Sequence, residues 1–167
     1  AAAGCVVVSG GAYGIDAAAH RGALAVDAPT VAILAGGVDV PYPRSNHQLF
    51  ERILHRGCLV SETPLGIQPL RHRFLVRNRL IAAWGAVTVV VEARSRSGAL
   101  ATASHAAMLG RDVVAVPGPI TSAASAGCNQ LIRDGAVLVT SAADVLELIR
   151  GDLPRYAPSI QSALDLA

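Results

Sequence analysis

The chain has 167 residues, and a hydrophobic content of 52% is enough to build one substantial core. All 14 basic residues are arginine, and the net charge of +2 is too small to draw nucleic acid to the whole surface. An anion site would therefore need a local arginine cluster. Three scattered cysteines exclude a disulfide framework, and no apolar stretch is long enough to span a bilayer, so we expect a cytoplasmic protein without a membrane partner.

Short β-branched runs and helical stretches alternate along the chain. Strands are predicted at 5–9, 30–34, 58–61, 87–92, 112–116 and 136–139, and helices at 15–26, 46–55, 74–84, 99–109, 129–133 and 142–150. This alternation predicts an α/β fold, a Rossmann-like doubly wound, mostly parallel sheet with helices on both faces. We expect one domain over 1–150, followed by a linker or disordered tail over 151–167.

Ligands of such sheets lie beyond the carboxyl ends of the strands. The loops that reach this edge are 9–14, 35–45, 61–73, 92–98 and 117–128. The first of them runs from Ser9 through Gly10 and Gly11 to Asp16 and opens a helix. It is either a phosphate cradle built from backbone N–H groups or a tight turn that needs glycine, and spacing alone does not decide.

The most informative stretch carries four arginines between Arg71 and Arg79, and no acidic residue occurs between Glu62 and Glu92. On a helix, Arg73 and Arg77 lie one turn apart, and so do Phe74 and Asn78. Arginine contacts phosphate, an aromatic ring stacks on a base and an amide supports it, so this grouping suits single-stranded nucleic acid. The alternative is a solvated basic face with the ring in the core. We favour binding, and we expect Arg77→Ala to weaken it with little loss of folding.

A later loop leads from Glu92 to Ser97 and Gly98 and then into a helix, where the first N–H groups can hold another phosphate. Glu92 is expected to form a structural ion pair with Arg77 or Arg79. No metal-ligand spacing, nucleophile elbow or phosphate-binding P-loop is present, so we expect a binding protein and not an enzyme.

Six motifs, in their order along the chain, together resemble the signature series of the DNA-processing protein A family (DprA/Smf). Their residues resemble those of actinobacterial members in particular. They are SGGAYGIDAAAH (9–20), GVDVPYPRSN (37–46), SETPLG (61–66), FLVRNRLIA (74–82), VVVEARSRSG (89–98) and GRDVVAVPG (110–118). The resemblance runs from about Cys5 to Ile149.

The resemblance implies single-stranded DNA binding in a basic pocket, a homodimer, and RecA loading during natural transformation and recombination. By position, the pocket would take Arg73, Phe74, Arg77, Asn78 and Arg79, with Ser9, Gly10, Ser97 and Gly98 from two loops. No catalytic residue, metal or cofactor is implied.

Two features depart from the family pattern. The chain enters a strand at once, so we expect the family's upstream strand, with its Gly-Ser-Arg turn, to precede residue 1, and its small C-terminal domain is absent from the sequence. The competing function is a nucleotide phosphoribohydrolase of the lysine-decarboxylase-like Rossmann family. That family carries P-G-G-x-G-T-x-x-E after a strand, whereas the corresponding loop here begins Glu92-Ala93-Arg94, which argues against hydrolysis.

Overall fold

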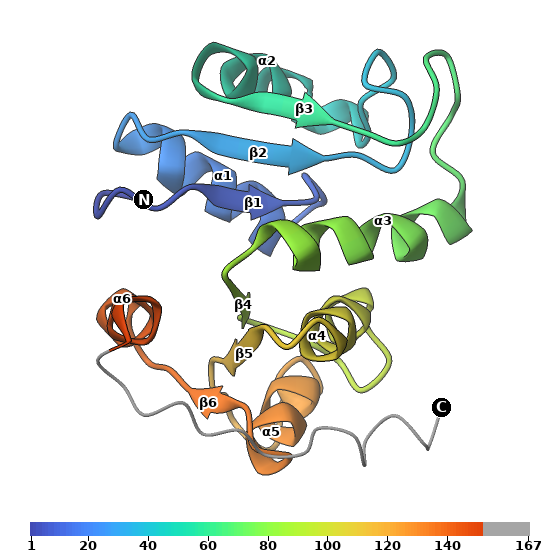
Figure 1. The fold of residues 1–167 in the computed structure, drawn as a ribbon. Coiled ribbons are helices and arrows are strands. Elements are labelled where there is room, and N and C mark those ends of the chain that lie inside the picture. The colour runs from blue at the N-terminus through green and yellow to red at the C-terminus, as the bar shows by residue number, and fades with distance from the viewer. Residues whose placement is uncertain (152–167) are drawn as a thin grey trace. The chain divides into compact units, whose positions relative to one another are not determined.

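The computed structural model describes residues 1–151, which form two compact units that divide between Trp84 and Gly85. Each unit contains a three-stranded parallel sheet and helices that pack on it (Figure 1). The strand orders are β1-β2-β3 and β4-β5-β6. Parallel strands joined by helices confirm the predicted Rossmann-like α/β fold class. The single domain over 1–150 stays a prediction, and the tail expected at 151–167 lies outside the described residues except for Gly151.

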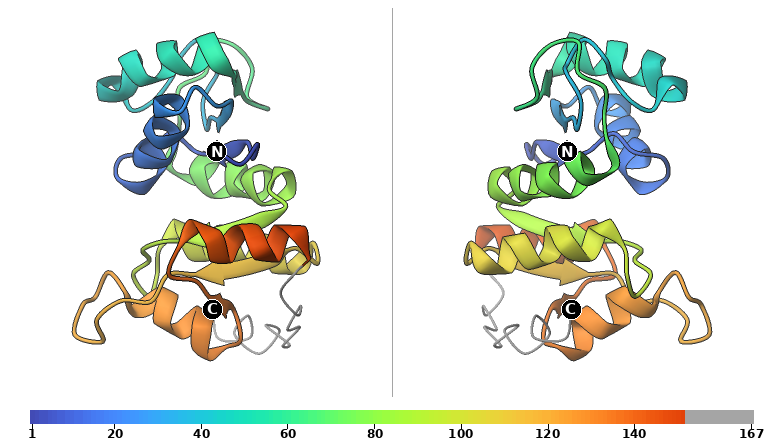
Figure 2. Two further views of the ribbon diagram at one scale, coloured as in Figure 1. Left: turned by 90° about the vertical axis from the view of Figure 1, so that its left-hand side faces the viewer. Right: turned by 90° about the vertical axis from the view of Figure 1, so that its right-hand side faces the viewer.

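The first unit carries the basic helix. Its elements are β1 (Val7–Ser9), α1 (Ile15–Ala25), β2 (Thr30–Ile33), the 3-10 helix η1 (Arg44–Asn46), α2 (His47–Arg56), β3 (Cys58–Val60) and α3 (Arg71–Trp84). Both views in Figure 2 show α1 and α2 together, with α3 on a separate side of the strands. Leu49, Phe50 and Ile53 follow helical spacing on α2, so they bury one face of that helix against Ala32 and Leu34 of the sheet region.

The second unit has a smaller core. Its elements are β4 (Val87–Val90), α4 (Gly98–Met108), β5 (Asp112–Ala115), α5 (Ala126–Arg133), β6 (Val137–Leu138) and α6 (Ala142–Arg150). In Figure 2, α4 and α6 lie on one side of the strands and α5 on the other. Val114, Val139 and Leu148 form the centre of the core. A capping box between Ser141 and Asp144 fixes the start of α6, because each residue's side chain accepts a hydrogen bond from the other's backbone N–H.

Two helix starts differ from the prediction by three residues, and the other starts agree within one residue. Helix α3 begins at Arg71, three residues before Phe74, soon after the helix-breaking Pro69. Helix α5 begins at Ala126 and not at Asn129, so Gly127 lies inside the helix and not before it. A side chain at Gly127 would come within 2.8 Å of the Ala93 carbonyl oxygen, so this glycine permits close packing and does not end the helix.

His20 is fully buried in α1, where it packs between the helix and the sheet and forms a hydrogen bond. The Thr30 hydroxyl donates to the Val7 carbonyl at 2.9 Å, and His20 Nδ1 lies 2.7 Å from the same hydroxyl oxygen. Because the one hydroxyl proton is directed at Val7, Nδ1 must carry the proton of the imidazole and donate it to Thr30. Burial lowers the pKa of His20 to about 4, against the attraction of the Asp16 carboxylate.

Candidate nucleic-acid interface

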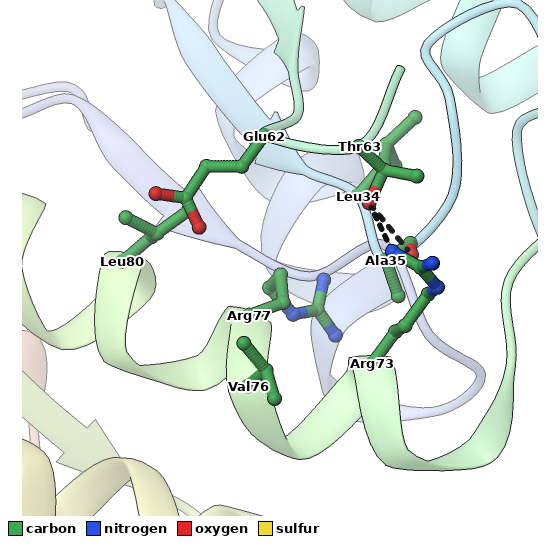
Figure 3. Close-up of a pocket in the computed structure, with 8 residues that line it drawn as sticks. All are labelled: Leu34, Ala35, Glu62, Thr63, Arg73, Val76, Arg77 and Leu80. Carbon is green, nitrogen blue, oxygen red and sulfur yellow. Dashed lines mark hydrogen bonds between the residues drawn. The ribbon is translucent and has the colours of Figure 1, made fainter. Parts of the chain in front are cut away.

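A cleft of about 220 Å³ lies in the first unit, at the carboxyl ends of β2 and β3. Side chains from α3 form one wall, and residues that follow the two strands form the other (Figure 3). The lining consists of Leu34, Ala35, Glu62, Thr63, Arg73, Val76, Arg77 and Leu80. The structure therefore places a cleft at the edge of the sheet where the sequence predicted a binding site, and it includes two of the predicted arginines.

Arg73 is the half-buried cation of this cleft. Its Nη1 donates to the Thr63 hydroxyl across 3.4 Å, and that hydroxyl donates to the Ala35 carbonyl at 3.3 Å (Figure 3). The Arg73 Nε is buried without a hydrogen-bond partner, and among residues 1–151 no carboxylate forms an ion pair with this guanidinium. Arg73 thus retains donor capacity at the cleft, which suits a phosphate or another oxyanion.

Arg77 lines the cleft but is mostly enclosed, and its predicted contribution to DNA binding stays a prediction. It is only 6% exposed, and Nη1 donates to the carbonyl of Gly10 at 2.9 Å and to the carbonyl of Ile33. Burial lowers the pKa of Arg77, and the nearby Asp16 carboxylate opposes that effect. Its guanidinium joins the ends of β1 and β2 from within the unit, so Arg77→Ala is now expected to affect folding, contrary to the expectation from sequence.

Backbone N–H groups of the loop after β1 are already hydrogen-bonded to a side chain of the helix that follows the loop, α1. Asp16 Oδ2 accepts hydrogen bonds from the N–H groups of Gly10 and Ala12, each at 3.1 Å. These are donors that a phosphate cradle would offer to a ligand, so the loop geometry favours the tight-turn interpretation left open above. Ser9 ends β1 and is half-buried, and Gly10 is buried against the Arg77 guanidinium.

The aromatic and amide positions of the basic run are also less open than predicted. Phe74 is half-buried, with the Arg77 Cζ 5.9 Å from the centre of its ring. Asn78 is 7% exposed. Arg77 and Phe74 lie close together, as predicted. Arg77, Asn78 and part of Phe74 face inward, however, because α3 packs these side chains against the strands.

Arg79 is exposed but already paired. Its Nη2 donates to Glu62 Oε1 at 2.7 Å, and both side chains are about half exposed, 49% for Arg79 and 50% for Glu62. The expected ion pair of Glu92 with Arg77 or Arg79 stays a prediction, because Glu92 belongs to the second unit. The lack of acidic residues between Glu62 and Glu92 suggested that the arginines of α3 have no acidic partner. Glu62 itself, however, reaches α3 and pairs with Arg79.

The second unit carries the two remaining predicted positions. Ser97 is the residue before α4 and has a buried hydroxyl oxygen without a hydrogen-bond partner, and Gly98 is the exposed first residue of that helix. Their predicted contribution to DNA binding stays a prediction.

Sequence reasoning missed Thr63 and Glu62 as lining residues of the cleft. Both follow β3 in the loop 61–73, which was singled out as one that reaches the binding edge. That position in the fold was the available signal, and neither residue type stands out by itself. Within residues 1–151 no group of three or more metal-ligating side chains occurs, and no helix has the length and apolar character needed to cross a bilayer.

Comparisons with known proteins agree on one family. The family model described as DNA recombination-mediator protein A matches residues 1–150. A DNA processing protein DprA of Mycobacterium tuberculosis (strain H37Rv) is 56% identical over 162 residues, which make up 96% of this chain and 42% of that protein. The chain therefore spans less than half the length of this relative.

Two solved structures share the fold. DNA processing protein A from Streptococcus pneumoniae superposes with a TM-score of 0.79 at 45% identity, over 84% of this chain and 50% of that one. DNA processing protein A from Helicobacter pylori gives a TM-score of 0.78 at 28% identity, over 89% of this chain and 67% of that one, and its structure was described for a unique single-stranded DNA binding mode.

Proposed function

Because the chain belongs to the DNA recombination-mediator protein A family, we propose that it binds single-stranded DNA through the cleft that contains Arg73. The observation that carries the proposal is the Arg73 guanidinium, which lies half-buried at the strand ends and, within residues 1–151, makes only one long hydrogen bond. A phosphodiester supplies the oxygen acceptors that this guanidinium lacks. The single-stranded DNA binding of the Helicobacter pylori relative supports the choice of ligand.

The size of the cleft favours an unpaired strand. A volume of about 220 Å³ admits a phosphate with part of a nucleotide, whereas the width of a duplex does not fit in it. Single-strand binding combines backbone phosphate contacts with base stacking. An aromatic pair, Phe74 of α3 and Tyr42 of the loop after β2, meets the cleft at Arg77, which lies over the Phe74 ring. The function proposed is binding without catalysis.

Further roles of the family are part of the proposal. The recombination-mediator description of the family supports delivery of the bound strand to a RecA-type recombinase. The proposal also includes action in the cytoplasm, in transformation or recombination, by a homodimer, and these parts rest on the resemblance of the sequence motifs. The chain spans less than half of its Mycobacterium relative, so these roles concern the whole protein.

A titration of labelled oligonucleotides followed by fluorescence anisotropy tests the binding. We expect tighter binding of single strands than of duplex of the same length across a series of salt concentrations, with an affinity that falls as salt rises. Equal affinity for the two forms, or no binding to either, would contradict the proposal.

Arg73→Ala is expected to weaken single-strand binding by about tenfold or more, since a hydrogen bond to a charged group contributes roughly 1.5–3 kcal/mol. Loss of one phosphate contact should also reduce the slope of log K against log salt by about 0.7. The matched control is Arg52→Ala, which removes the same charge from an exposed position on α2. If both variants bound equally, net charge and not the cleft would explain the affinity.

Glu62→Gln is expected to tighten single-strand binding by about threefold, because it removes a carboxylate from the cleft and frees Arg79, whose exposed ion pair is worth less than about 1 kcal/mol. The control is Glu51→Gln, which changes the net charge equally from α2. Unchanged binding by the Glu62 variant would show that neither Glu62 nor Arg79 lies near the path of the strand.

A further inference from the structure

Tyr42 lies on the loop that follows β2 and packs against Phe74 of α3. Its ring centre is 5.8 Å from that of Phe74, and the two planes meet at 70°, the edge-to-face arrangement of an aromatic pair. Tyr42 is 48% exposed. The Phe74 ring lies 5.9 Å from Cζ of Arg77, a lining residue of the cleft, so Arg77 links the aromatic pair to the cleft.

Phe74 is poorly placed to stack on a base by itself. The Arg77 guanidinium lies over its ring at 5.9 Å, and Tyr42 makes the second aromatic contact. Because Arg77 is buried, that contact is on the interior side of Phe74. A base that sought Phe74 would therefore compete with two existing partners, whereas Tyr42 offers open surface.

The loop holds Tyr42 in place before any ligand arrives. Asp39 accepts a hydrogen bond from the Gly66 N–H at 2.9 Å, and the Gly37 N–H donates to the Ile67 carbonyl at 2.9 Å. These contacts tie the loop to the segment after β3, and prolines flank Tyr42 on both sides. An aromatic side chain on a fixed loop loses little conformational freedom when a base stacks on it.

We propose that Tyr42 is a base-stacking residue of the interface, with Phe74 as the side chain that supports its ring and Arg73 as the contact to the adjoining phosphate. This inference rests on the proposed binding of single-stranded DNA. It assigns stacking to a residue outside the basic run and gives Phe74 a supporting role.

Photochemical cross-linking of the unmodified chain tests the assignment directly. An oligothymidylate that carries 5-iodouracil, irradiated in the complex and analysed by mass spectrometry, is expected to attach to Tyr42. Attachment to Phe74 with none at Tyr42 would overturn the assignment. Failure of the unmodified chain to bind the oligonucleotide would instead count against the proposed function.

Two variants give a second, independent measurement. Tyr42→Leu is expected to weaken oligothymidylate binding about tenfold with an unchanged salt slope, because stacking involves no phosphate contact. Tyr42→Phe keeps the ring and should bind within about twofold of the unmodified chain, and thermal unfolding of both variants shows whether the loop is intact. Affinity of Tyr42→Leu equal to that of the unmodified chain, while the unmodified chain binds, would refute the inference and leave the proposed function standing.

Discussion

Arg77→Ala is expected to reduce the free energy of unfolding by about 3 kcal/mol, because it leaves the buried carbonyls of Gly10 and Ile33 without their shared donor. Each unsatisfied buried acceptor costs roughly 1–3 kcal/mol, and relief of the desolvated charge offsets part of the sum. The measurement is urea unfolding followed by circular dichroism. This expectation replaces the one from sequence, in which the same substitution left folding almost unchanged.

Arg73→Ala is the matched control, since it removes the same side chain one turn earlier on α3. Arg73 is half-buried and makes one long hydrogen bond, so its loss should cost less than about 1 kcal/mol of stability. The two variants should therefore separate, with Arg77→Ala acting on folding and Arg73→Ala on DNA affinity. Equal stability of the two proteins would show that Arg77 is not the internal link between β1 and β2.

Acidification from pH 7 to pH 4 is expected to remove about 3 kcal/mol of stability through His20 alone. The pKa of His20 is about 4 in the folded protein and 6.5 for the unperturbed side chain, so the unfolded chain takes up a proton that the folded one excludes. Stability from this group is complete above pH 6.5 and is lost as the pH falls toward 4. Urea midpoints measured at several pH values follow the loss.

His20→Asn supplies the control for that experiment. The asparagine amide can donate to Thr30 from nearly the position of Nδ1, but it does not titrate. The variant should be less stable at pH 7, because the smaller side chain leaves a cavity, yet its stability should change less between pH 6.5 and pH 4. Parallel pH profiles for the two proteins would mean that other groups cause the acid sensitivity.

The sequence predicted the fold well because hydrophobic periodicity reflects burial directly. Every predicted strand and helix is present, and the errors lie at the ends, where local rules conflict. Gly127 interrupts a helical pattern by propensity, yet close packing on Ala93 keeps it within α5. No window of sequence contains that contact.

The cleft lies at the sheet edge named from the sequence, whereas the contacts of its individual side chains could not be predicted. Spacing placed Arg73 and Arg77 one turn apart, which is correct, but it could not show which of the two points inward. That difference depends on carbonyls of Gly10 and Ile33, which are 67 and 44 residues away in the chain. Glu62 and Tyr42 were undervalued for the same reason, since each meets α3 only after the chain folds.

The packing of Gly10 against Arg77 links the substitutions that these two positions can accept. A methyl group at position 10 would lie 2.5 Å from the guanidinium nitrogens, so any larger residue there must displace a side chain that holds two strand ends. A shorter residue at position 77 opens that space but leaves the carbonyls unpaired. Neither residue can be substituted alone without a loss of stability, and the effects on stability of substituting both will not be additive. Gly10 and Arg77 therefore constrain each other's substitution, although in the sequence one looks like an ordinary flexible glycine and the other like one arginine among many.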